Sequence, residues 1–157
     1  MKKLRIYLDT SVISHLLADD ATDKMDDTQE LWELFQQGEY EIIISSLTFD
    51  ELKKCNIEKR VIITKYIELI NYSSVPITPQ QRDLAQKYLQ HEVLSKKSMD
   101  DLVHIACSVL NGCNYIISWN FKHLVNMKTI NKVNGVNLLL GFQEIKIVPP
   151  PMLLQGI

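Results

Sequence analysis

Acidic residues stand at three points of the sequence where carboxylates could do chemistry. Asp9 follows the apolar stretch 6–8, Glu51 comes shortly after a second apolar stretch, and Asp100 and Asp101 open a third apolar pattern. Carboxylates that gather in one place repel one another, and a cation relieves that repulsion. Oxygen ligands without an accompanying His/Cys constellation favour Mg²⁺ or Mn²⁺ over Zn²⁺. A metal held this way orients water, lowers its pKa and stabilises charge on a phosphodiester oxygen.

Each acid also has an ordinary structural interpretation. Asp9, followed by Thr10 and Ser11, stands where a residue capping a helix is expected. Glu51 could be a solvent-facing helix residue. Whether these acids have a function depends on whether they come together in the fold.

The acidic pair before the third apolar pattern is ambiguous in the same way. Ser98-Met99-Asp100-Asp101 has the form of a capping box, in which Asp101 would only partner Ser98. An acid in a first helical turn is favourable in any case. Spacing alone does not choose between Asp100 and Asp101. His104, one turn later, is interpreted as a core or surface imidazole rather than a ligand.

Strands that alternate with helices must position these acids. Helices are expected near 11–17, over the segment that ends at Gly38, from Ser45-Ser46 onward, and over 58–69, 79–90 and 98–111. The expected strands are 4–8, 41–45, 114–118 and 145–148, with a short extended piece at 75–77. This alternation predicts one α/β domain over 1–157, with a central, mainly parallel sheet flanked by helices on both faces. The carboxyl ends of parallel strands meet at one edge, where the acids would converge.

The remaining segments are predicted from composition. The acid-rich stretch 19–27 is expected to be a solvated loop, since it lacks the glycine and terminal glutamate of a calcium loop. A turn is expected over 131–137, and the prolines at 149–151 are expected to close off the last strand. The apolar runs 138–140 and 152–154 could complete the core or lie at an interface.

Composition limits the class of protein. The chain has 157 residues, 46% of them hydrophobic, and a formal net charge of −2, which argues against holding nucleic acid by bulk positive charge. It does not exclude an enzyme that touches a few phosphates. No apolar run reaches the length of a membrane span, so a cytoplasmic protein without membrane contact is expected. Cys55, Cys107 and Cys113 form no Cys-x-x-Cys pair, and Cys107 is expected to be a buried thiol.

Three motifs, in order, resemble those of PIN domains. Leu8-Asp9-Thr10-Ser11-Val12-Ile13 is similar to the opening motif of that family. Ser45-Ser46-Leu47-Thr48-Phe49-Asp50-Glu51-Leu52 is similar to the second, whose glutamate falls on Glu51. Asp101-Leu102-Val103-His104-Ile105-Ala106 is similar to the third, in which the aspartate lies three residues before His-Ile-Ala. That register selects Asp101 over Asp100.

The resemblance implies a metal-dependent ribonuclease. In PIN domains the acids bind Mg²⁺ or Mn²⁺ and water attacks the RNA phosphodiester, so Asp9, Glu51 and Asp101 are the expected metal ligands. Standalone PIN domains of this size are often toxins of toxin–antitoxin pairs. An antitoxin protein and a homodimer are therefore the expected partners, beside the RNA substrate.

One position departs from the family pattern. The fourth motif usually carries Thr-x-Asp after the third buried strand, and Ser118-Trp119-Asn120 stands there in this chain. Asn120 still offers an oxygen or orients a water, but it brings no charge, which should weaken metal binding. Ser118 matches the hydroxyl position and is expected to hold that water or an acid in place.

Basic residues flank each acid in the sequence and form a candidate rim for RNA phosphates. The expected contacts are Lys53, Lys54, Lys97 and Lys122. Ordinary solvated helix ends explain any single one equally well. Trp119 and Phe121 could stack on bases, but packing beside the third buried strand is the favoured interpretation.

Three functions compete at this stage. The leading hypothesis is an Mg²⁺- or Mn²⁺-dependent endoribonuclease that uses Asp9, Glu51 and Asp101, assisted by Asn120 and Ser118. The second is a catalytically weak PIN-like module that binds RNA or a protein, and Asn120 favours it. The third is a phosphotransferase of the haloacid-dehalogenase type with Asp9 as nucleophile. That motif needs a second aspartate two residues later, where this chain has Ser11.

Overall fold

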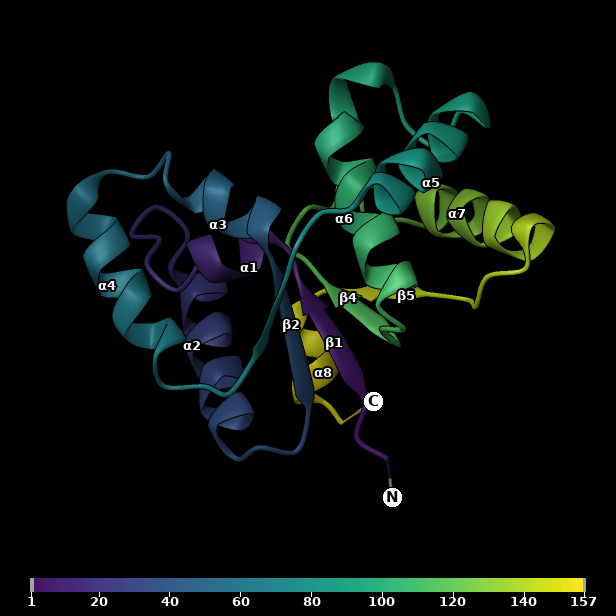
Figure 1. Cartoon of the computed structure of the whole chain (residues 1–157). Helices are drawn as coiled ribbons and strands as arrows, with labels where there is room; N and C mark the ends of the chain where they lie inside the picture. The colour runs from purple at the N-terminus through teal and green to yellow at the C-terminus, as the bar shows by residue number, and fades with distance from the viewer. Residues whose placement is uncertain (1, 157) are drawn as a thin grey trace.

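A sheet of five parallel strands forms the centre of the protein (Figure 1). The computed structural model describes residues 2–156, and the strand order is β3-β2-β1-β4-β5 with every neighbouring pair parallel. The expected α/β fold is confirmed. The strands are β1 Arg5–Leu8, β2 Glu41–Ser45, β3 Ser73–Val75, β4 Tyr115–Ile117 and β5 Lys146–Val148.

Helices cover both faces of this sheet, and in Figure 1 the first group lies to the left of the strands, with α8 behind them, and the second group lies to the right. One group is α1 Thr10–Ser14, α2 Thr22–Gln36, α4 Ile57–Ile67 and α8 Pro150–Leu154. The other is α5 Pro79–Gln90, α6 Met99–Leu110 and α7 Met127–Leu140, with a short 3₁₀ turn at Lys96–Ser98 before α6. The helix α3, Ser46–Leu52, begins directly where β2 ends.

The strands are apolar on both sides because each side faces a separate core. Ile6 and Leu8 pack with α1, α2 and α8, whereas Tyr7 between them packs with α5, α6 and α7. In β2, Ile43 faces the same core as Tyr7. Buried parallel strands are continuous hydrophobic runs for this reason.

The strand order reverses between β1 and β4, and we refer to the region at the carboxyl ends of these two strands as the crevice. From β1 the chain runs outward to β2 and β3, then returns to pair β4 on the other side of β1. Where strand order reverses in this way, the loops diverge and a ligand site commonly forms. Asp9 follows β1 and Ser118 follows β4, so both lie at this point.

The acid-rich stretch 19–27 is partly helical, which corrects the predicted loop. The helix α2 begins at Thr22 and continues to Gln36. Asp23 lies in its first turn, where a negative charge interacts favourably with the helix dipole. The buried face with Leu31, Trp32 and Phe35 provides the packing that the acidic start alone did not indicate.

The predicted turn over 131–137 is also wrong, because these residues lie inside α7. Asn126 caps this helix by accepting a hydrogen bond from the Thr129 amide at 2.9 Å. Val133 and Val136 are buried on one face, and Gly135 is tolerated between them. The closing prolines likewise begin a helix, since Pro150 occupies the first turn of α8, where no amide hydrogen is needed.

The two apolar runs near the end of the chain have mixed environments. Leu138 and Leu139 are 82% and 68% exposed, whereas Leu153 is buried in the core that contains Ile6 and Leu8.

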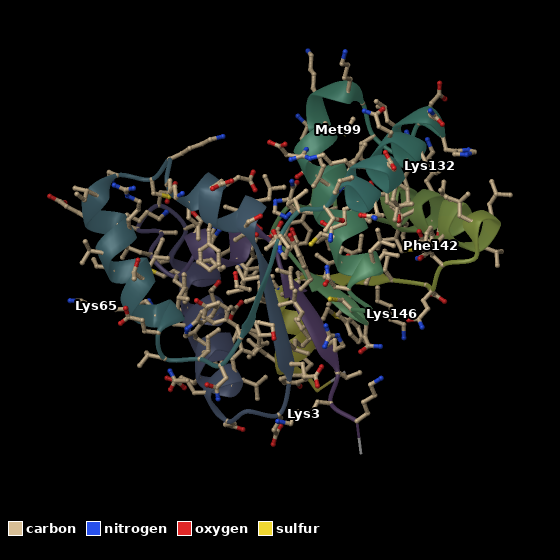
Figure 2. All side chains as sticks on the ribbon, viewed as in Figure 1. Lys3, Lys65, Met99, Lys132, Phe142 and Lys146 are labelled. Atoms are coloured by element: carbon tan, nitrogen blue, oxygen red, sulfur yellow. The ribbon has the colours of Figure 1, made fainter. Side chains whose placement is uncertain are left out.

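Cys107 is buried, as expected. None of the helices within residues 2–156 has the length and apolar character needed to span a bilayer. Lys65 on α4 and Lys132 on α7 mark opposite sides of the molecule (Figure 2).

We predict that Tyr88→Phe destabilises the protein by about 1–3 kcal/mol, because a buried acceptor loses its donor. The Tyr88 hydroxyl donates to Asn137 Oδ1 at 2.5 Å and ties α5 to α7. Urea unfolding of wild type and variant measures the change. Tyr66→Phe, which removes a half-buried hydroxyl with no hydrogen bond within the described residues, is the control and should change stability by less than about 0.5 kcal/mol.

Candidate active site

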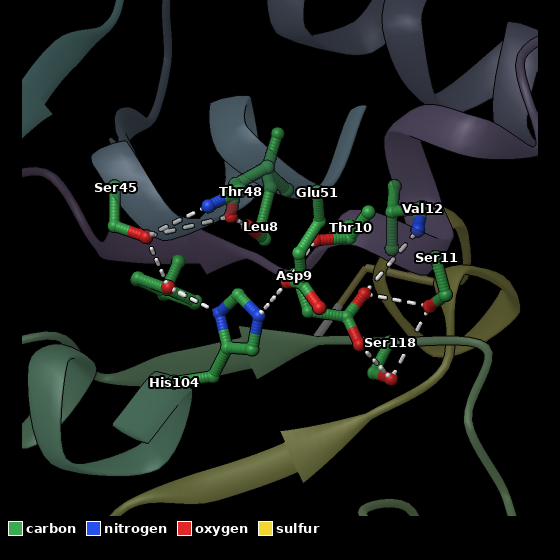
Figure 3. Close-up of polar contacts among 11 residues, drawn as sticks. Leu8, Asp9, Thr10, Ser11, Val12, Ser45, Thr48, Glu51, His104 and Ser118 are labelled. Atoms are coloured by element: carbon green, nitrogen blue, oxygen red, sulfur yellow. Dashed lines mark hydrogen bonds and ion pairs between the residues drawn. The ribbon is translucent and has the colours of Figure 1, made fainter. Parts of the chain in front are cut away.

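Asp9 lies at the centre of the crevice and is almost fully buried, with 4% exposure (Figure 3). Each of its oxygens accepts a serine hydroxyl at 2.6 Å, Oδ1 from Ser11 and Oδ2 from Ser118. Oδ1 also accepts the Val12 amide at 3.2 Å, so Asp9 caps α1 as well. The capping and functional interpretations of Asp9 are therefore compatible.

The two serines connect Asp9 to the turn that follows β4. Ser11 Oγ accepts the Trp119 amide and Ser118 Oγ accepts the Asn120 amide, both at 2.9 Å. Each hydroxyl thus accepts one hydrogen bond from a backbone amide and donates one hydrogen bond to an oxygen of Asp9. Burial raises the pKa of Asp9, although these two hydroxyls, the charge of His104 and the Val12 amide oppose the rise.

Glu51 on α3 is held by two donors. His104 Nε2 lies 2.5 Å from Glu51 Oε1, and Thr10 Oγ1 donates to the same oxygen at 2.7 Å. Because a carboxylate only accepts, the hydrogen in the first contact belongs to His104 Nε2. Glu51 Oε2 accepts no hydrogen bond from residues 2–156 and is free to bind a ligand.

A buried chain of hydrogen bonds supports His104 from behind. Its Nδ1 lies 2.5 Å from the Tyr7 hydroxyl, which lies 2.7 Å from Ser45 Oγ (Figure 3). Ser45 Oγ accepts the Thr48 amide as the cap of α3. These hydrogen bonds lead from Ser45 at the start of α3 through Tyr7 on β1 to His104 on α6. From His104 they lead back to Glu51 on α3.

His104, which the sequence analysis interpreted as a core or surface imidazole, lies in the site against one of its acids. It is buried, as a core residue is, yet its ring contacts Glu51 directly. Its position one turn after Asp101 on α6 was the available signal, since residues three apart share a helix face. Burial alone would raise the pKa of Glu51, but the hydrogen bond and charge of His104, the Thr10 hydroxyl and Lys54 together lower it.

Asp101 has no hydrogen-bond partner for its carboxylate within the described chain, and the predicted capping box is wrong. Ser98 precedes α6 but its side chain caps nothing. Its backbone angles, φ −104° and ψ 26°, continue the 3₁₀ turn instead of the extended conformation usual for a capping residue. Burial raises the pKa of Asp101, His104 and His123 oppose the rise, and the charges of Asp9 and Glu51 add to it.

The free carboxylate oxygens are suited to a hard divalent cation. Glu51 Oε2 and both oxygens of Asp101 lack protein donors in residues 2–156, and Asp9, Glu51 and Asp101 raise one another's energy by repulsion. Oxygen-only donors of this kind match Mg²⁺ or Mn²⁺. As the side chains stand, the described residues contain no cluster of three or more His, Cys, Asp or Glu at metal-binding distances. Closing around a cation therefore requires side-chain movement.

Asn120 stabilises the turn at the rim of the site. Its Oδ1 accepts the His123 amide at 3.0 Å, which is a local turn contact. An aspartate could accept the same hydrogen bond, so the difference between the two residues here is one negative charge. Trp119 is buried and donates to Thr28, as core packing predicts, whereas Phe121 is 47% exposed.

The predicted RNA-contacting lysines are spread over several elements. Lys53 is exposed and paired with Asp50 at 3.4 Å, and Lys54 lies close enough to lower the pKa of Glu51. Lys97 is exposed in the 3₁₀ turn before α6, and Lys122 is exposed in the turn after β4. Of the four, Lys54 is thus placed near an acid of the site.

Comparisons with known proteins agree with this geometry. The solved VapBC2 complex of Rickettsia felis, bound to a DNA fragment from its promoter, matches with a TM-score of 0.58 and 14% identity, over 93% of this chain and 98% of that chain. VapC20 of Mycobacterium tuberculosis, a toxin that cleaves the sarcin-ricin loop, matches with a TM-score of 0.58 and 18% identity, over 88% and 97%. At these identities the likeness establishes the fold.

A comparison with curated proteins gave no match. The family model of the PIN domain matches residues 6–122. This span contains the three acids and the beginning of the turn after β4. The chain belongs to the PIN domain family.

Proposed function

We propose that this protein is an Mg²⁺- or Mn²⁺-dependent endoribonuclease. The observation that carries the proposal is the repulsion of the Asp101 carboxylate by Asp9 and Glu51, together with carboxylate oxygens on Glu51 and Asp101 that accept no hydrogen bond within residues 2–156. A bound divalent metal would supply positive charge for the phosphodiester and an acidified water. PIN domains are generally nucleases, and VapC20 cleaves the sarcin-ricin loop.

The residues of this chain have distinct tasks in that reaction. Asp9 is held rigidly by Ser11 and Ser118 and presents its remaining lone pair to the crevice. Glu51 is kept ionised and oriented by His104, so it is a ligand ready at neutral pH. A bound cation would stabilise the ionised form of Asp101, which burial and the like charges of its neighbours destabilise.

We extend the proposal to the partners. VapC20 is a toxin and the VapBC2 structure is bound to a DNA fragment from its promoter, so a toxin role with an antitoxin protein is the biological setting that we propose here. The exposed Leu138 and Leu139 on α7 offer an apolar surface for a homodimer.

A second function is favoured by Asn120. Its oxygen serves the turn, and it leaves the site one charge short of the family pattern. The protein would then be a PIN-like module that binds RNA or a protein partner with weak catalysis.

Asp9→Asn should lower cleavage of a mixed single-stranded RNA pool by at least about 100-fold, on the scale of removing one electrostatic contributor to a transition state. The assay compares added Mn²⁺, Mg²⁺ and EDTA. Asp50→Asn is the matched control, because Asp50 is an exposed neighbour of Glu51 outside the crevice. Equal cleavage by wild type and Asp9→Asn would contradict the proposed role of Asp9.

Asp101→Asn should raise the melting temperature of the metal-free protein near neutral pH by roughly 2–4 °C, the shift that about 1 kcal/mol gives at this size. The raised pKa of Asp101 means that its ionised form destabilises the fold. That penalty falls away as pH drops through the folded-state pKa, so the gain should vanish in acid. Asp100→Asn, exposed in the same helical turn, controls for the helix dipole.

Metal addition gives the complementary measurement on the same pair of variants. Mn²⁺ should raise the melting temperature of wild type and Asp100→Asn, and raise that of Asp101→Asn less. An equal rise in all three proteins would remove Asp101 from the metal ligands.

Asn120→Asp should increase metal-dependent cleavage several-fold, because the new carboxylate keeps the turn contact and adds one charge to the site. The same RNA assay measures it at limiting Mn²⁺. Activity in Asn120→Asp together with a silent wild type would support the binding-module function instead. If wild type and Asn120→Asp both cleave RNA and do so at the same rate, the charge at this position does not limit metal binding.

A further inference from the structure

A groove of about 640 Å³ lies beside the acidic crevice and is lined by none of its acids. Its walls come from the connection between α5 and α6, the turn after β4 and the first turns of α7. This volume is within the range of ligand pockets, about 300–1,000 Å³. The lining residues that matter here are Ser95, Phe121, Lys122, Lys128 and Lys132, with Glu92 as the one acid.

The groove is basic in a protein that is acidic as a whole. Three lysines against one glutamate give a local charge of +2, whereas the chain has a formal net charge of −2. Lys128 and Lys132 are one turn apart on α7 and therefore share a face. Lys122 and Lys128 are exposed and form no ion pair within residues 2–156, and Lys132 donates to the Glu92 carbonyl at 3.0 Å. The groove is therefore suited to an anion.

An exposed aromatic ring lies on the crevice side of this groove. Phe121 is 47% exposed and packs at 6.2 Å between ring centres against Trp119. Lys24 Nζ lies 5.6 Å from the centre of its ring. A ring of this kind beside cationic side chains is the combination by which proteins bind single-stranded nucleic acid, since bases stack on the ring and lysines contact phosphates.

The turn that carries Phe121 and Lys122 is held in place by side chains. Asn126 Nδ2 donates to the carbonyls of Phe121 and Lys122 at 3.2 and 3.1 Å, and Thr129 Oγ1 donates to the carbonyl of His123 at 2.8 Å. Phe121 and Lys122 are thus presented from a fixed backbone, which reduces the entropic cost of binding.

The groove and the acids share the turn after β4, since Ser118 donates to Asp9 and Phe121, three residues later, lines the groove. Phe121 directly follows Asn120, and His123 in the same turn is close enough to Asp101 to influence its pKa. Nucleotides that flank a phosphate bound at the three acids can therefore reach the groove along this turn. The predicted contacts Lys53, Lys54 and Lys97 do not line this groove.

We propose that this groove binds the single-stranded RNA that flanks the cleaved bond, with a base stacked on Phe121 and phosphates against Lys122, Lys128 and Lys132. The inference rests on the proposed nuclease function, which it deepens by assigning a substrate subsite. It places the flanking nucleotides on the α7 side of the acids.

The test measures binding of a short, labelled single-stranded RNA of mixed sequence by fluorescence anisotropy in EDTA, over a series of salt concentrations. Lys128→Ala/Lys132→Ala should raise the Kd about tenfold or more at low salt and reduce the slope of log K against log salt by about 1.4, or 0.7 for each lost contact. Phe121→Ala should raise the Kd about tenfold with little change in that slope.

The matched control is Lys3→Ala/Lys65→Ala, which removes two lysines far from the groove (Figure 2). Lys3 resembles Lys132 in donating to one carbonyl, that of Gly38 at 2.7 Å, and exposed Lys65 resembles Lys128. The control should bind RNA like wild type. Groove variants that bind like the control, or a wild type that does not bind this RNA, would overturn the inference.

The same variants separate this inference from the proposed function. In the cleavage assay the groove variants should raise KM and leave the Mn²⁺-induced rise in melting temperature unchanged. If the groove variants cleave RNA in a metal-dependent way with an unaltered KM, RNA binding by the groove is rejected and the proposed nuclease function stands. If wild type binds RNA without cleaving it and the groove variants lose that binding, the groove is an RNA-binding site and the nuclease function is rejected.

Discussion

The buried carboxylate of Asp9 is the constraint on which the site depends. An ionised group with 4% exposure is costly unless its oxygens are hydrogen-bonded. The fold provides three donors, and two of them, Ser11 and Ser118, are fixed by backbone amides of the turn after β4. The same bonds that stabilise the charge therefore determine the path of that turn, including where Asn120 and Phe121 emerge.

Glu51 and Asp101 lie in the same crevice and have opposite pKa shifts, since donors surround one and not the other. His104 and Thr10 share one oxygen of Glu51 and lower its pKa, whereas Asp101 has only neighbouring charges to offset its burial. Through Tyr7 and Ser45, the contact of His104 with Glu51 is tied to the core of the α5–α7 face. The Glu51 carboxylate is thus positioned by a buried series of hydrogen bonds.

Much of this arrangement was predictable from the sequence because it depends on local pattern. The apolar runs before Asp9 and in β2 predicted parallel strands, and parallel strands bring their carboxyl ends together. The position of α7 was not predictable in this way, since its asparagines and Gly135 are typical of turns and its burial depends on tertiary packing. The contact of His104 with Glu51 spans 53 residues, a separation that no local pattern encodes.

The overlooked helix also explains why total charge was a poor guide to the local charge of the surface. A formal net charge of −2 argues against a basic surface only if the charges are spread evenly. Lys128 and Lys132 share a face only when residues 127–140 are helical, and Lys122 joins them only because Asn126 holds the preceding turn against α7. In the predicted turn these lysines would have had no common direction. The local field that a phosphate experiences depends on such placement, so a chain with more acids than bases can still present a basic groove beside an acidic crevice.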